Sequence, residues 1–145
     1  MSKLIIQFSP AGRLPEQSAA VIQSFIKKYD DAVVPETPNN SMIFVALFDD
    51  KIIGYASVTV NQKSAKITSL FIEKGYRKQG FGFKLTIDIL DKLSKTGCEK
   101  IGLDSPDFLL PFFQALGFTI SKELRQLSTH IQHKHFEIEN PCPSF

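Results

Sequence analysis

One segment of the chain is the most informative about the fold: Leu70-Phe71-Ile72-Glu73-Lys74-Gly75-Tyr76-Arg77-Lys78-Gln79-Gly80-Phe81-Gly82. An apolar, β-prone run ends, a short polar loop follows, and two glycines open a segment with helical periodicity. Glycine lets backbone N–H groups approach a ligand without a Cβ in the way. The first N–H groups of a helix have no partner within the helix, and the dipole makes this end positive, so the junction suits a pyrophosphate.

The charges around this junction favour an anion, although the glycines alone are also typical of a tight turn into a helix. Lys74, Arg77, Lys78 and Lys84 surround it, against the single acidic residue Glu73. Two other phosphate-binding motifs are excluded. A Walker A loop needs Gly-Lys-Ser/Thr, and Phe83-Lys84 follows Gly82 here. A dinucleotide fingerprint needs a third glycine where Leu85 stands.

The complete pattern resembles the acetyl-CoA motif of the GNAT superfamily, in which Arg/Gln-x-x-Gly-x-Gly/Ala opens the central helix after an apolar strand. Arg77, Gly80 and Gly82 occupy the fixed positions. Two further segments are similar to the family: Ile52-Ile53-Gly54-Tyr55-Ala56, and Leu110-Pro111-Phe112-Phe113-Gln114-Ala115-Leu116-Gly117-Phe118, which matches a segment ending Phe-Tyr-Glu-Lys-Leu-Gly-Phe. The resemblance covers roughly residues 41 to 118 well and both ends loosely.

Hydrophobic periodicity predicts the element order β, α, β, β, β, α, β, α, β. The expected strands are Lys3–Phe8, Met42–Phe48, Ile52–Val60, Ala65–Ile72, Lys100–Asp104 and Thr129–Ile138, and the expected helices are Pro15–Asp30, Gly80–Lys95 and Phe108–Leu116. A length of 145 residues fits one domain, 1–145. The fold class is therefore α+β (mixed α/β). The resemblance implies a GNAT-like acyl-CoA N-acyltransferase fold, with a mostly antiparallel central sheet, a splayed parallel strand pair and flanking helices.

The resemblance also implies where acetyl-CoA binds as cosubstrate. The parallel strands Ala65–Ile72 and Lys100–Asp104 would splay apart and admit the pantetheine arm. Backbone groups of Leu70 and Ile72 would bond the arm and the thioester carbonyl, and N–H groups from Lys78 to Phe83 would bond the pyrophosphate. The expected cofactor-binding residues are Leu70, Phe71, Ile72, Arg77, Lys78, Gln79, Gly80, Phe81, Gly82 and Phe83.

The sequence lacks some of the side chains that acetyl transfer would use as general acid and base. Phe113 stands where the family commonly has a tyrosine that protonates the leaving thiolate. Asp104 and Tyr55 are the candidates that remain, with helix capping and a core tyrosine as their structural alternatives. Lys66 and Thr68 lie where some relatives place a base, and neither is a good base. Glu73 is expected to face solvent.

The function expected from this resemblance is transfer of an acetyl group from acetyl-CoA to a primary amine, on a small molecule or a protein, by direct attack in a ternary complex. The alternative is a catalytically weakened GNAT-fold module that binds CoA for sensing or regulation. The acceptor contacts the variable ends, so the sequence does not identify it.

Composition argues against several other classes of protein. Seventeen Lys and Arg against fifteen Asp and Glu give a net charge of +2, which provides no broad footprint for nucleic acid. No apolar run reaches the ~18 residues of a membrane span. Two cysteines, Cys98 and Cys142, and no signal peptide indicate free thiols and a cytoplasmic location. We expect a monomer or a homodimer. His133 and His135 share a strand face, but without companion ligands substrate contact or ordinary exposure is favoured over a metal site.

Overall fold

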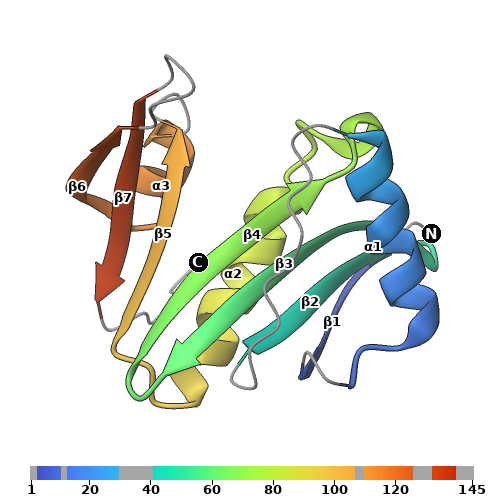
Figure 1. Ribbon diagram of the computed structural model, residues 1–145, viewed down its shortest axis with the longest axis horizontal. Helices are drawn as coiled ribbons and strands as arrows, with labels where there is room; N and C mark the ends of the chain where they lie inside the picture. Colours follow the sequence, from blue (N-terminus) through green and yellow to red (C-terminus); the bar gives the residue numbers. More distant parts are fainter. Residues whose placement is uncertain (1–2, 11–12, 30–40, 107–109, 126–131, 140–145) are drawn as a thin grey trace.

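The computed structural model describes residues 3–10, 13–29, 41–106, 110–125 and 132–139, which form a seven-stranded sheet in the order β1-β2-β3-β4-β5-β7-β6 (Figure 1). The strands are β1 (Leu4–Pro10), β2 (Ser41–Phe48), β3 (Lys51–Asn61), β4 (Ser64–Ile72), β5 (Lys100–Pro106), β6 (Thr119–Arg125) and β7 (Gln132–Glu139). Among these strands only β4 and β5 pair in parallel, and the other neighbours pair antiparallel. The predicted fold class is confirmed.

Two helices lie on opposite faces of the sheet (Figure 1). Helix α1 (Glu16–Lys28) buries Ile22 and Phe25, which lie three residues apart on one stripe. Helix α2 (Phe81–Lys95) buries an apolar stripe formed by Leu85, Ile89, Leu90 and Leu93, together with the polar Thr86. A short helix, α3 (Leu110–Ala115), precedes β6, and a single 3₁₀ turn, η2 (Lys74–Tyr76), follows β4.

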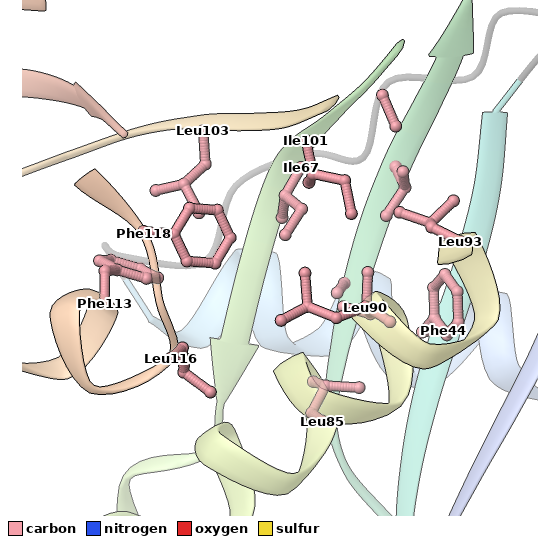
Figure 2. Close-up of a cluster of buried hydrophobic side chains, with 14 of the residues drawn as sticks. Phe44, Ile67, Leu85, Leu90, Leu93, Ile101, Leu103, Phe113, Leu116 and Phe118 are labelled. Carbon is pink, nitrogen blue, oxygen red and sulfur yellow. The ribbon is translucent and has the colours of Figure 1, made fainter. Parts of the chain in front are cut away.

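Each face of the sheet has its own hydrophobic core. The larger core lies under α2 and α3, and Figure 2 shows Phe44, Ile67, Leu90, Phe113 and Phe118 converging there. The smaller core lies under α1. It contains Ile22, Phe25, Ile43, Val45, Tyr55 and Phe71. Successive residues of a strand point to opposite faces, so β3 contributes Ala56 and Val58 to the first core and Tyr55 to the second.

Several predicted boundaries are wrong. Strand β5 continues through Pro106, so Asp104 lies inside a strand and does not begin a helix. Pro15 is the residue before α1 rather than its first residue. Strand β6, the first strand of the terminal hairpin, is absent from the predicted elements because Thr119–Arg125 mixes charged and apolar residues without a clear period. Asp107 and Phe108 lie outside the described residues.

Candidate functional site

Strands β4 and β5 form a fork. Their parallel register runs from Ser64↔Lys100 to Ile67↔Leu103 and ends there. Beyond that point β4 continues to Ile72 and β5 to Pro106. Figure 1 shows the two strands side by side at one end and diverging toward the loop that leads into α2. The predicted splay of the parallel pair is confirmed.

The backbone of β4 offers alternate residues to the fork. Glu73 N–H donates to the Ile53 carbonyl on β3 over 2.7 Å. Backbone groups of residues two apart point to the same edge of a strand, so the N–H and C=O groups of Phe71 also point toward β3. Leu70 and Ile72 then direct their backbone groups to the opposite edge, toward β5. These two residues are the ones that the resemblance assigns to the pantetheine arm.

The loop after β4 bends its backbone twice into the left-handed region, at Lys78 (φ 64°) and Gly80 (φ 85°). Gly80 is the N-cap of α2 and makes no side-chain capping hydrogen bond. The N–H of Lys84 bonds the Gly80 carbonyl over 3.0 Å, which starts the helical ladder. The three N–H groups before it, of residues 81 to 83, therefore precede the ladder and point out of the helix end. Such an end, preceded by left-handed bends, suits a diphosphate.

The two motif glycines serve different purposes. A Cβ added at Gly80 would meet open space, so the requirement for glycine there is the positive φ alone. Gly82 has an ordinary helical φ, and a Cβ there would lie 3.7 Å from Ile72 and 3.9 Å from Phe112. These are normal van der Waals distances, so packing does not require glycine at position 82. Its absent side chain leaves the end of the helix uncovered.

The cations near the loop do not form one patch. Arg77 turns inward, and its Nε donates to the Ile72 carbonyl over 2.6 Å. Lys84 pairs with Asp88 over 2.8 Å along α2. The Nζ of Lys74 lies 5.9 Å from the Tyr29 ring centroid. Lys78 is exposed, at one of the two left-handed bends. The backbone therefore dominates the expected anion contacts.

Glu73 does not face solvent as expected. Its side chain is only 14% exposed; it accepts from the Tyr29 hydroxyl over 3.1 Å and pairs with Lys51 over 3.7 Å. The hydrogen bond from Lys51 to Tyr76, and then the charge of Glu73, raise the pKa of Lys51 above its ordinary value. This group of side chains ties the end of α1 and the start of β3 to the loop, which gives Glu73 a structural role there.

The candidate catalytic residues lie apart. Phe113 is 3% exposed on the α2 face, with its ring 5.0 Å from Phe112 and 5.8 Å from Phe118 (Figure 2). Tyr55 is 0% exposed in the α1 core; its ring stacks on Phe25 with centroids 6.5 Å apart and lies tilted against Phe71 at 5.6 Å. The backbone of Asp104 pairs with His135 beyond the fork, and its side chain is outside what the structure describes. Tyr55 and Phe113 therefore occupy opposite faces.

Sequence reasoning assigns no role to two features of the fork. Gly54 lies opposite Ile72, and a Cβ on it would collide with the Phe71 carbonyl and approach the Ile72 Cδ1 to 2.6 Å. Position 54, within the Ile52–Ala56 segment that resembles the family, thus requires glycine for a steric reason. Ser57 and Ser69 form a hydroxyl cluster with Thr68. The sequence signal for this cluster is weak, because the thirteen residues from 57 to 69 contain five serines and threonines and only three of them meet.

A comparison with protein families matches residues 12–140 to the acetyltransferase (GNAT) domain. The chain belongs to the GNAT acetyltransferase family. A curated relative, the glucosamine 6-phosphate N-acetyltransferase of Trypanosoma brucei brucei, is 32% identical over 75 residues. That match covers 47% of this chain and 51% of the relative, so the chain spans about half the length of the curated relative it matches.

Solved GNAT-type structures share the fold at low identity. Escherichia coli ElaA superposes with a TM-score of 0.79 at 13% identity, covering 94% of this chain and 100% of that one. A Pseudomonas aeruginosa acyl-CoA N-acyltransferase gives 0.78 at 14% identity, with 93% and 99% covered. A GNAT acetyltransferase from Elizabethkingia anophelis with acetyl-CoA bound gives 0.69 at 14%, with 94% and 97% covered.

Two further sequence expectations concern metals and membranes. Among the described residues, no group of three or more His, Cys, Asp or Glu side chains is placed to hold a metal ion. His133 and His135 lie on β7, opposite Pro106 and Asp104, while His130 is outside the described residues. Within the same described part of the chain, no helix is both long and apolar enough to cross a membrane.

Proposed function

We propose that this protein is an acetyl-CoA-dependent N-acetyltransferase that transfers the acetyl group to a primary amine by direct attack in a ternary complex. The observation that carries the proposal is the connection from the end of β4 at Ile72 to the start of α2 at Gly80. A parallel strand leaves its neighbour, and a left-handed loop then presents an uncapped helix end within reach of the same fork. An acyl-CoA has both parts that this arrangement suits, a diphosphate and a long arm with amide groups.

The site residues follow from this assignment. N–H groups of residues 78 to 83 hold the diphosphate, which needs donors but no specific side chains. The arm lies along β4, where Leu70 directs its backbone groups and Ile72 its N–H into the fork, while the Ile72 carbonyl accepts from Arg77. The amine nitrogen attacks the thioester carbonyl carbon, the C–N bond forms and the C–S bond breaks. The amine loses one proton, and the coenzyme thiolate gains one.

Phe113 carries no proton to donate, so the proposed reaction runs without the usual tyrosine. A thiolate whose conjugate acid has a pKa near ~8.5 is a tolerable leaving group, and a general acid contributes about 10²- to 10⁴-fold. The reaction is thereby slowed and not prevented. Asp104 and Tyr55 remain the proposed alternative proton donors or acceptors, with Tyr55 less accessible because it is completely buried.

A second candidate function rests on the same buried Phe113. A GNAT-fold module that binds CoA without turnover would need the loop and the fork but no acid or base. Release of free thiol from acetyl-CoA that depends on an added amine separates the two. We would test glucosamine 6-phosphate, polyamines, aminoglycosides, amino acids and peptides, with the Gly82→Glu variant as the blank.

The proposal predicts that one class of amine gives release above the blank. Binding of acetyl-CoA without release for any class would favour the second candidate. The T. brucei relative is the reason to include the amino sugar phosphate, and the remaining classes sample other primary amines.

A further inference from the structure

Three hydroxyl groups meet where β4 leaves β5. Ser57 Oγ lies 2.7 Å from Thr68 Oγ1 and 2.6 Å from Ser69 Oγ. Ser57 is 0% exposed and Ser69 is 7% exposed, while Thr68 is half-buried. The neighbouring positions of both strands are apolar. A buried hydroxyl cluster is therefore unusual here, because the core of a sheet is normally apolar and a buried polar group needs hydrogen-bond partners.

One assignment of the hydroxyl protons satisfies every contact in the cluster. Thr68 donates its hydroxyl proton to the Ser57 carbonyl over 3.3 Å. Ser57 must then donate across the contact with Thr68, and Ser69 must donate to Ser57 Oγ. The Ser57 N–H in turn donates to Ser69 Oγ over 3.1 Å. All three hydroxyls are satisfied in one arrangement, so the cluster is rigid.

The cluster lies on a β-bulge. Ser57 pairs with Ser69 and Val58 pairs with Ile67, which leaves Thr68 as the additional residue of β4. The sequence pattern predicts that Lys66 and Thr68 face one side of the strand, in alternation with Ile67, Ser69 and Phe71, and the bulge breaks that alternation at Thr68. Thr68 and Ser69 consequently both reach Ser57. A bulge of this kind re-aims the residues that follow it.

The bulge decides which residues face the fork. One additional residue reverses the edge toward which each later residue directs its backbone groups. Because of it, Leu70 and Ile72 face β5; in a regular strand Phe71 would do so. The parallel pairing with β5 ends at Ile67, immediately before Thr68. The hydroxyl cluster therefore lies at the point where the fork opens.

We propose that Thr68, together with Ser57 and Ser69, is a positioning residue that locks the bulge and so aims the backbone of Leu70 at the thioester carbonyl of bound acetyl-CoA. This inference rests on the proposed function and adds to it the residues that fix the acyl end. The diphosphate end, at α2, does not depend on the cluster. Loss of the Thr68 hydroxyl should therefore affect the acetyl group more than the rest of the coenzyme.

The test compares acetyl-CoA with CoA by calorimetry on the full chain. Thr68→Val keeps the branched shape and removes the hydroxyl, and Thr68→Ser keeps the hydroxyl as the matched control. We expect Thr68→Val to weaken acetyl-CoA binding by about fivefold while CoA binding stays within about twofold of wild type. Thr68→Ser should bind both ligands as wild type does. In ¹³C NMR, the carbonyl shift of bound acetyl-CoA labelled at that carbon should move toward its free value in Thr68→Val only.

Equal losses for both ligands, or no selective loss, would overturn the inference, because a purely structural hydroxyl would give either result. Ser69→Ala removes one member of the cluster without changing Thr68, and it is the second variant if Thr68→Val does not fold. A selective loss of acetyl-CoA affinity in Ser69→Ala supports the inference, and the absence of such a loss overturns it. If wild type binds neither ligand, the proposed function fails and this inference with it. If wild type binds both and the variants show no selective loss, only this inference fails.

Discussion

The side chain of Arg77 returns to the strand that leads into its own loop, where its Nε donates to the Ile72 carbonyl over 2.6 Å. Its guanidinium carbon also lies 5.3 Å from the Phe71 ring centroid, within the range of a cation–π contact. The family resemblance places Arg77 among the coenzyme-binding residues. The contact indicates that it shapes the loop from within, before any ligand arrives.

Arg77→Ala should therefore destabilise the unliganded protein. A hydrogen bond from a charged donor contributes about 1.5 to 3 kcal/mol, and we expect a loss in this range in urea unfolding. Arg77→Gln, which keeps an amide donor, should lose less. Weaker acetyl-CoA binding with unchanged unliganded stability would instead indicate direct contact with the phosphates.

Gly54→Ala should be strongly destabilising. The added Cβ collides with the Phe71 carbonyl and approaches the Ile72 side chain, so β3 and β4 must separate at the fork. Overpacking of this kind costs about 1 to 3 kcal/mol. Gly75→Ala is the matched control, because a Cβ at Gly75 meets no atom within 4 Å. Thermal unfolding of both variants tests the expectation, and equal melting temperatures would contradict it.

Phe113→Tyr should act on stability and rate in opposite directions. The ring is 3% exposed among Phe112 and Phe118, so the new hydroxyl is buried in the free protein at a cost of about 1 to 3 kcal/mol. With acetyl-CoA and a correct acceptor, thiol release should become faster, short of ~10²-fold, since the surroundings are not tuned for a general acid. An unchanged rate, with a sharp loss in Asp104→Asn or Tyr55→Phe, would assign the proton transfer to those residues.

Cys98 should react slowly with thiol reagents in the folded protein. It is 7% exposed, its Sγ lies 3.2 Å from the Lys100 carbonyl, and burial raises the pKa of its thiol. A raised pKa keeps the unreactive thiol form to higher pH. In a Cys142→Ser background, alkylation should be slow at neutral pH and become fast in urea. Fast labelling of the native protein would contradict the buried position.

The local features of the site are predictable from sequence. Glycines at Gly80 and Gly82, a preceding apolar run and a following 3.6-residue period are all visible within about twenty residues, and they predict a strand, a loop and a helix end. The parallel pairing of this strand follows only from the family resemblance, because pairing partners far apart in the chain leave no local pattern.

The features that shape the fork are not predictable in this way. The bulge at Thr68 depends on Ser57, eleven residues away on another strand, and a serine or threonine is equally common on an exposed strand face. The inward turn of Arg77 depends on the position of the Ile72 carbonyl. Glu73 is expected in solvent from sequence because its partners, Tyr29 and Lys51, come from two other elements. Each of these contacts depends on the folded arrangement, which periodicity does not encode.

The most direct test of the account is calorimetric titration of acetyl-CoA into wild type, Gly82→Glu and Gly75→Glu. A glutamate at position 82 lies in the first turn of α2, where the helix dipole favours it and its Cβ meets neighbours only at van der Waals distance, so we expect the fold to survive. Its charge then faces the diphosphate, and affinity should fall at least about tenfold. Gly75→Glu adds the same charge to the same loop at an open position outside the helix end and should bind nearly as wild type. Unchanged affinity in a folded Gly82→Glu protein, or equal losses in both variants, would contradict the placement of the coenzyme at this helix.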